Sequence, residues 1–356
     1  RPVELCDAEV LRRVRQRSLA RLRQDVEPVP ARTLGIFLPR WQHVAAAGAR
    51  TELEGADGVL AVVDQLGGAR LPASALEQLV LPARVRDYHP GMLDELTSTG
   101  DVLWAGAGEL SGGDGMVTLL TAEAATELAP APGDPDLGPL HTSVLETMRG
   151  GGARFFREIL QAVTDAEDEP PATGALLEIL WDLVWAGHLT NDTLAPLRAR
   201  LGGGRPAHVP RRTAPRARSS LRRGVRAAAA AATAARVDLP SSVGRWSALP
   251  QPPPEVRTEA VVARTASLLD RHGVLVRESA GMGDLPGGFA AAYQVLRRLE
   301  DSGSVRRGYL VAGLGAAQFA LPEVVDRLRA DAADLAARLE DSADPRAHVL
   351  AATDPA

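Results

Sequence analysis

One ten-residue pattern occurs three times in this 356-residue chain and constrains its fold more than any other feature. The pattern reads Leu-x-x-Leu-x-x-x-Gly-x-Val/Leu. Its copies begin at Leu93, Leu180 and Leu296, so that successive copies start 87 and 116 residues apart. The glycines are Gly100, Gly187 and Gly303, and the final positions are Val102, Leu189 and Val305. Recurrence of this kind is typical of one supersecondary unit that is used several times.

The spacing inside the pattern predicts a helix that ends at the glycine and a strand that follows it. Leucines three residues apart lie on one helix face, and glycine readily adopts the left-handed conformation that ends many helices. Residues 101–120 and 304–322 then have the pattern of two strands joined by a Gly-rich turn. Further helices upstream complete the layout of a winged helix. We therefore expect a mainly α fold with small β wings (α+β), built from tandem winged-helix modules.

The three copies also predict the domain boundaries. The middle copy lacks an evident wing, because residues 188–201 continue into a helix. We expect residues 1–50 to hold a basic helix and a strand of a preceding module, 51–128 a winged helix, 137–203 a winged helix without a clear wing, 204–253 an Arg/Ala-rich linker, 254–330 a winged helix, and 331–356 a C-terminal helix leading to a β-barrel that is missing here.

Two tryptophans four residues apart, Trp181 and Trp185, lie on the last helix of the middle copy. A helix that reads a DNA groove needs Arg, Lys or Asn, whereas the charges of this helix are Glu178 and Asp182. We therefore expect the two tryptophans to pack between modules or protomers. The alternative is that they stack on or intercalate between bases.

Arginines gather in three places. Residues 11–24 form a helix with an apolar and a basic face, which fits phosphate contact, a solvated surface or an oligomer contact equally well. The stretch 202–237 has nine arginines and no acid, and we expect its Arg211, Arg212, Arg222 and Arg223 to contact phosphates if it is more than a linker. In the last copy, Arg297 and Arg298 lie on the expected recognition helix, and Arg306 and Arg307 begin the wing. These four are the best candidates for duplex contact, mainly to phosphates.

Composition excludes several functions. All 40 basic residues are arginine, so the lysine of a Walker A loop is absent and the segment does not hydrolyse ATP by that route. The seven histidines show no metal-site spacing, so we expect no metal. One cysteine and no apolar run of membrane-spanning length predict a cytoplasmic protein without membrane insertion. For acid–base chemistry, the polar candidates are Asp64 and Asp354.

Long strings carry a family resemblance. The segments "LLEILWDLVWAGHLTNDTLAPLRARL", "GRWSALP" and "GGFAAAYQVLRRLEDSGSVRRGYLVAGLGAAQFALP" occur in this order. Together they resemble the C-terminal region of the bacterial large helicase-related (Lhr) family, and the likeness covers nearly the whole chain.

The resemblance implies an ATP-dependent DNA helicase that moves 3′ to 5′, with its motor upstream of this segment. ATP and Mg²⁺ then belong to that motor, and no cofactor is expected here. The family's extension is similar to the AlkZ-type helix-turn-helix glycosylases, which combine winged helices with a β-barrel. This sequence departs from them, because no glutamine begins their Gln-x-Asp or Gln-x-Gln motif and the barrel is missing.

These observations predict a winged-helix array from an Lhr-type DNA repair helicase, acting as a DNA-binding and oligomerisation platform. Its expected partners are single-stranded or tailed DNA and further copies of the chain. One alternative is a glycosylase-like module that removes damaged or misplaced bases, with a carboxylate such as Asp64 or Asp354 activating water. Another is an oligomerisation scaffold without DNA affinity.

Overall fold

The computed structural model describes residues 7–11, 13–14, 17–18, 27–46, 51–133, 137–167, 170–202, 240–250, 258–281, 285–315, 317–340, 348, 350 and 352–356. Three modules in this part of the chain share one order of elements: helix, short strand, helix, helix, strand, strand. In each module the first strand pairs with the last, and the last pairs with the second. The expected mainly α fold of tandem winged helices with small β wings is confirmed.

The first module contains the longest hairpin. Its helices are α3 (Gly55–Leu66), α4 (Ala73–Ala75) with η2 (Leu76–Val80), and α5 (Pro90–Thr99), and its sheet holds β2 (Leu71–Pro72), β4 (Val102–Glu109) and β5 (Gly115–Thr121). A turn, η3 (Ser111–Gly113), joins β4 to β5, and the short strands β1 (Leu53–Glu54) and β3 (Val85–Arg86) pair in parallel. As predicted, α5 ends at Gly100, whose φ of 87° is left-handed.

The middle module has a wing, which corrects the sequence prediction. Its helices are α7 (Pro139–Arg149), α8 (Phe156–Ala166) and α9 (Thr173–Trp185), and β8 (Arg245–Ala248) pairs with both β6 (Arg154–Phe155) and β7 (Leu189–Asn191). After β7 the chain forms α10 (Ala195–Gly202), and it returns through η4 (Pro240–Ser242). The end of the expected linker 204–253 is therefore a wing strand, which sequence reasoning missed because its partner lies more than 50 residues earlier.

The last module closes the series. Its helices are α12 (Thr258–His272), α13 (Arg277–Gly281) and α14 (Gly288–Ser302), and its sheet has the order β10 (Arg306–Gly308), β11 (Gln318–Ala320), β9 (Val274–Leu275). The final helix α15 (Pro322–Glu340) starts inside the range expected for this module and runs past its expected end at residue 330.

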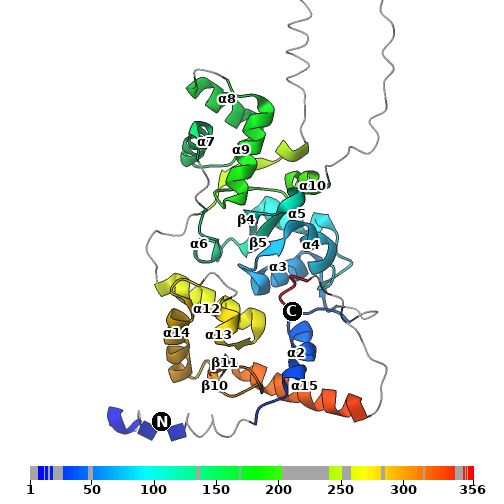
Figure 1. Ribbon diagram of the computed structural model, residues 1–356, viewed down its shortest axis with the longest axis vertical. Helices are drawn as coiled ribbons and strands as arrows, with labels where there is room; N and C mark the ends of the chain where they lie inside the picture. The colour runs from blue at the N-terminus through cyan, green and yellow to red at the C-terminus, as the bar shows by residue number, and fades with distance from the viewer. Residues whose placement is uncertain are drawn as a thin grey trace, which may run out of the picture.

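The segment 29–44 packs against the last module, not against a preceding one. Val29 forms an isolated parallel bridge with Val311, and Phe37 lies in the same apolar cluster as Val274 and Val324. The segment comprises η1 (Ala31–Thr33) and α2 (Leu34–Trp41), and α2 lies between α15 and α3 (Figure 1). Nothing local in its sequence indicates a partner some 280 residues away.

Two large apolar regions organise the described part of the molecule. One large cluster runs through the first and middle modules, and two adjoining clusters fill the last module with α2 and α15. A smaller cluster around Leu120, Leu128 and Leu249 packs against Ala263 of the last module. A short helix, α6 (Ala125–Leu128), follows the first module and contacts α12 of the last. Figure 1 shows the middle module at one end, the first in the centre and the last at the opposite end.

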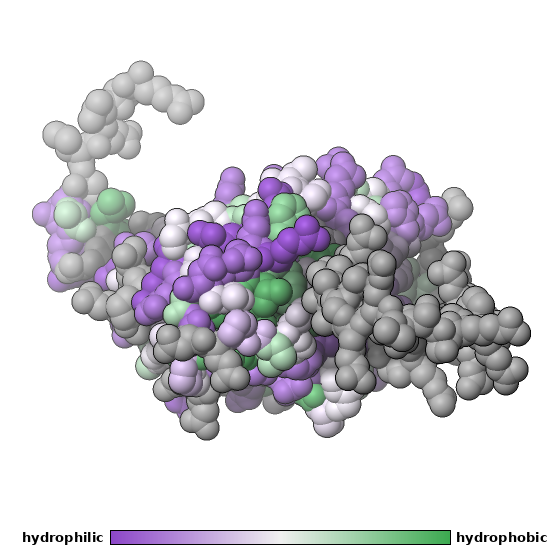
Figure 2. Space-filling model, turned by 90° about the horizontal axis from the view of Figure 1, so that it is seen from above, coloured by the Kyte–Doolittle hydropathy of each residue, from purple (hydrophilic) through white to green (hydrophobic). Residues whose placement is uncertain are grey.

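The surface seen from the middle-module end is mainly hydrophilic, with narrower hydrophobic areas between the polar ones (Figure 2). Among the described helices, none combines the length and the apolar character needed to cross a bilayer.

Candidate nucleic-acid interface

The last module presents a basic face on α14 and β10. Arg297 and Arg298 are exposed, whereas Arg306 and Arg307 are half-buried. Neither Arg297 nor Arg298 pairs with a carboxylate among the described residues, so both guanidiniums are available to a ligand. The structure thus brings the four sequence-predicted arginines onto one helix and the strand that follows it.

Aromatic rings hold one of these arginines in place. The Arg307 guanidinium lies 5.4 Å from the ring centroid of Tyr293 and 5.6 Å from that of Phe319. Tyr293 and Phe319 are themselves in edge contact, with centroids 5.8 Å apart. Cation–π contacts of this kind reduce the freedom of a guanidinium without neutralising its charge. Arg307 is therefore positioned and still charged.

The wing that carries Arg307 is braced by a buried amide. The Gln318 side chain is fully buried, and its oxygen accepts hydrogen bonds from the N–H groups of Leu310 and Val311. Its amide nitrogen donates to the Val311 and Gly315 carbonyls. These bonds satisfy backbone groups that the short β10–β11 ladder leaves without partners.

Trp181 and Trp185 lie inside the chain, between the first and middle modules. Trp181 is fully buried, with its ring centroid 5.5 Å from Trp185, 5.8 Å from Trp246 and 6.5 Å from Trp104 of β4. Trp185 packs on the first module's hairpin at Gly115, where a Cβ would approach its ring to 2.7 Å or less. The third helix of the middle module, α9, thus packs against the first module.

Trp185 also borders a hollow between these two modules. The cavity has a volume of about 600 Å³, and Arg70, Gly108 and Asp182 are among the residues that line it. His141 Nε2 lies 3.2 Å from an Asp182 carboxylate oxygen at its edge. The described lining of this cavity thus carries both charge signs.

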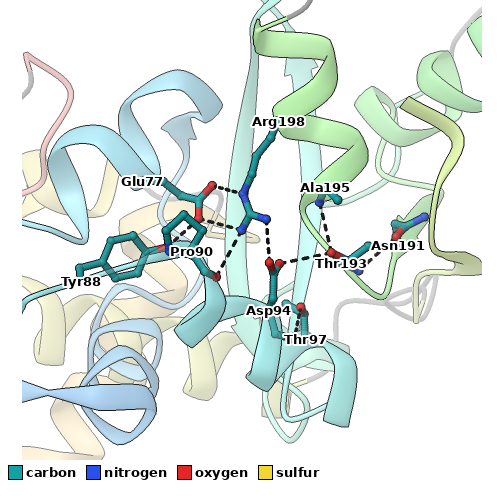
Figure 3. A network of polar contacts seen from close by, with 9 residues as sticks. All are labelled: Glu77, Tyr88, Pro90, Asp94, Thr97, Asn191, Thr193, Ala195 and Arg198. Carbon is teal, nitrogen blue, oxygen red and sulfur yellow. Dashed lines mark hydrogen bonds and ion pairs between the residues drawn. The ribbon is translucent and has the colours of Figure 1, made fainter. Parts of the chain in front are cut away.

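A polar network fastens the same two modules together (Figure 3). Arg198 of α10 donates from Nε and Nη2 to Glu77 at 2.6 and 2.9 Å, and from Nη1 to Asp94 at 2.8 Å. Tyr88 donates to Glu77 and Thr193 to Asp94. Burial and the Glu77 hydrogen bond raise the pKa of Tyr88. Burial lowers the pKa of Arg198, but its bonds to Glu77 and Asp94 outweigh burial and raise it overall.

The two carboxylate candidates have different surroundings. Asp64 is exposed on α3. The Asp354 side chain is only 1% exposed, and its two oxygens accept hydrogen bonds of 2.6 and 2.8 Å from the fully buried Arg84. Arg84 also donates to Gln42, whose amide nitrogen donates to the Pro355 carbonyl. The end of the chain is thus joined to the first module and to α2.

A second cavity has a volume of about 680 Å³, and Trp41, His43 and Gln65 are among its lining residues. Trp41 donates its indole N–H to the Asp270 carbonyl, and Gln65 donates to the Trp41 carbonyl. The cavity therefore has an aromatic wall whose position is fixed by hydrogen bonds.

Some predictions lie beyond what the structure describes. Arg211, Arg212, Arg222 and Arg223 fall outside the described residues. Within the described part of the chain, no group of three or more His, Cys, Asp or Glu side chains is placed to hold a metal ion. Sequence reasoning missed Tyr309, an exposed aromatic directly after β10, although its position beside Arg306 and Arg307 was visible in the sequence.

Fold and site together define a tandem winged-helix protein with a basic face on its last module. Residues 29–122 and 254–340 each match a family model described as large helicase-related protein, winged-helix domain. The chain belongs to the large helicase-related (Lhr) family and corresponds to part of its C-terminal region.

Two relatives cover almost all of the chain. It is 44% identical over 361 residues to the Lhr helicase/probable uracil glycosylase of Mycolicibacterium smegmatis, a match covering 99% of this chain and 22% of that protein. It is 40% identical over 362 residues to the Lhr helicase/uracil glycosylase of Escherichia coli, covering 98% and 23%. The chain thus spans about a fifth of the length of these relatives.

Proposed function

We propose that this chain is the DNA-binding platform of an Lhr-type DNA repair helicase, and that the face formed by α14 and β10 contacts the DNA backbone. The observation that carries the proposal is the pair of exposed, unpaired guanidiniums of Arg297 and Arg298, beside an Arg307 held by two rings. The third helix of a winged helix is the element that enters a DNA groove. An ATP-dependent 3′–5′ motor elsewhere in the protein uses the ATP and Mg²⁺.

The test measures DNA affinity over a range of salt concentrations. We expect Arg297→Ala with Arg298→Ala to weaken binding to all sequences about equally and to reduce the salt slope by about one per lost phosphate contact. Arg157→Ala is the control, because Arg157 is also exposed but lies on α8 of the middle module. Equal affinities for wild type and the double variant would refute this interface.

The arginine-rich stretch 202–237 adds phosphate affinity in the same proposal. Its support is positional, because the chain leaves the middle module at α10 and re-enters the same module's sheet at β8. Arg211→Ser, Arg212→Ser, Arg222→Ser and Arg223→Ser together are expected to lower the salt slope without changing preference among DNA sequences. An unchanged salt slope would mean that residues 202–237 only connect α10 to β8.

Self-association is the second part of the platform role. The N-terminal helical segment exposes Val10, Leu11 and Val14 by 50%, 58% and 59%. Burying these side chains against another copy would remove apolar surface from water. Leu11→Asp with Val14→Asp is expected to lower the mass measured by light scattering, and an unchanged mass would contradict the assignment of this helix.

A second candidate function is removal of uracil from DNA. Both relatives carry uracil glycosylase in their names, and the chain has a cavity of about 680 Å³ with Trp41 in its wall. A pocket that receives a flipped base is typically walled by aromatic or apolar side chains. Uracil release from a single-stranded oligonucleotide, abolished in Asp354→Asn while its urea unfolding stays that of the wild type, and retained in Asp64→Asn, would support this activity. No release by the wild-type chain would exclude it here.

A further inference from the structure

Tyr309 is an aromatic residue that the wing of the last module holds out to solvent. It follows β10 directly and is 44% exposed, whereas the other aromatic residues of this module, Phe289, Tyr293 and Phe319, pack into its core. The ring itself is not part of the apolar clusters of this module. Its position therefore needs a different explanation.

The ring is fixed in position before any ligand arrives. The Gly313 N–H donates a 2.9 Å hydrogen bond to the Tyr309 hydroxyl across the loop. The loop backbone is braced at Leu310 and Val311 by the buried Gln318 amide and on its other side by Val29, whose N–H donates to the Leu310 carbonyl. Little conformational freedom remains to be lost when a ligand stacks on the ring.

The surroundings of the ring select an anionic partner. Arg307 and Arg306 of β10 lie two and three residues before it, and Arg297 lies one helical turn after Tyr293, the ring that Arg307 covers. Among the described residues of β10 and the loop that follows it, 306–315, the charged side chains are Arg306 and Arg307. A ligand that brings both phosphates and a flat aromatic surface fits this arrangement.

We propose that Tyr309 stacks on an unpaired base, so that the last module recognises the junction between double-stranded and single-stranded DNA. This rests on the proposed function, because the arginines must hold the phosphates near the wing. Inside a duplex each base face is covered by its neighbours, whereas the base next to a duplex end or in a tail offers a free face to an aromatic side chain. The arginines then supply affinity for any DNA, and Tyr309 supplies the preference for a junction.

The experiment uses the whole chain and three DNAs of equal duplex length: blunt, with a 3′ tail, and with a 5′ tail. A 2-aminopurine at the first unpaired position reports stacking through its fluorescence. We expect Tyr309→Ala to weaken binding to one tailed DNA by roughly tenfold, the range for loss of one base–aromatic stack, and to leave the blunt duplex and the salt slope unchanged. Tyr309→Phe keeps the ring but loses the hydrogen bond from Gly313, and it is expected to keep a reduced junction preference.

Controls separate this proposal from the one it rests on. Phe155→Ala removes another exposed aromatic, on the middle module, and is expected to have no effect on the preference. Unchanged tailed-DNA affinity and fluorescence in Tyr309→Ala overturn the stacking proposal alone, provided that the Arg297 and Arg298 variants still lose affinity. A change in mass by light scattering without a change in DNA binding assigns Tyr309 to a protein contact and also overturns it. Absence of DNA binding by the wild-type chain refutes the proposed function itself.

Discussion

Arg84 is a charged residue with no exposed surface, and it joins three parts of the chain that are distant in sequence. Its guanidinium binds both Asp354 oxygens and the Gln42 amide oxygen, and it also donates to the Val80 carbonyl at 3.1 Å. A buried charge is tolerated only when its partners replace the water it has lost. The role of this cluster is therefore to fix the position of residues near Asp354 against the first module.

Arg84→Met leaves the Asp354 carboxylate buried without its partner. We expect a loss of about 3–5 kcal/mol of unfolding free energy, the usual cost of breaking a buried ion pair from one side. Urea unfolding followed by tryptophan fluorescence measures it, with Arg329→Met on the exposed side of α15 as the control. Adding Asp354→Leu is expected to restore part of the loss; a double variant worse than Arg84→Met would contradict the ion-pair explanation.

His272 makes stability depend on pH. Burial, and to a smaller extent the neighbouring Arg271, lowers the pKa of His272 from 6.5 to about 4. Between these values the unfolded imidazole takes up a proton that the folded one does not, so stability is constant above about pH 6.5 and falls as the pH drops toward 4. At pH 5 the loss should reach at most about 2 kcal/mol.

The His272→Phe variant is expected to remove this part of the pH dependence, because it keeps an apolar ring and loses the proton site. Urea unfolding at pH 7 and pH 5 provides the measurement. His89→Gln, at an exposed histidine, is the control and should keep the wild-type difference between the two pH values. An equally steep fall in His272→Phe would assign the dependence to other groups.

At the scale of elements, one sequence motif serves two purposes. Helices α9 and α14 carry the same leucine and glycine frame and are each the third helix of a winged helix. On α9 the remaining positions include Trp181 and Trp185, which pack against the first module, whereas α14 carries Arg297 and Arg298 toward solvent. The frame sets the fold, and the residues between its fixed positions decide whether the helix faces protein or a ligand.

Gly303, which ends α14, is required because its backbone is left-handed. It is not required because a side chain would clash. Gly303 has φ 84° and open space where a Cβ would lie, and so we expect Gly303→Ala to destabilise the chain by about 1–2 kcal/mol. Gly174 in α9 also has open space but no positive φ, so Gly174→Ala should not destabilise. Thermal unfolding of both variants measures the two losses of stability. Equal losses in Gly303→Ala and Gly174→Ala would contradict the role assigned to the positive φ.

The elements that could be predicted are those whose signals are local. Leucine spacing and glycine stops predicted the helices and hairpins of the first and last modules. The middle wing was missed because β8 follows β7 only after more than 50 residues, and the attachment of α2 to the last module depends on contacts such as Phe37 with Val324. Tyr309 was missed because exposure of an aromatic side chain is decided by the tertiary fold, which periodicity alone does not reveal.

At the scale of the whole molecule, the chain consists of two packing units built from three modules. The first and middle modules share one apolar cluster around Trp104, Trp181 and Trp246. The last module forms the other unit with α2 and α15, and α12 joins it to α3, where buried Arg271 donates to the Gly67 carbonyl at the end of that helix. This division places the proposed DNA-binding face in a unit distinct from the one that buries Trp104, Trp181, Trp185 and Trp246.

The two packing units are expected to open independently of each other. Arg198→Met removes the partner of Glu77 and Asp94, so we expect faster hydrogen–deuterium exchange in α5, α10 and η2 and little change in α14 or α15. Arg40→Met is the matched control in the other unit, because Arg40 pairs with Asp331 and Asp334 of α15. It should speed exchange in α2 and α15 alone. Faster exchange throughout the chain in either variant would mean that the three modules open together, and the DNA-binding face would then depend on the packing of Trp181 and Trp185.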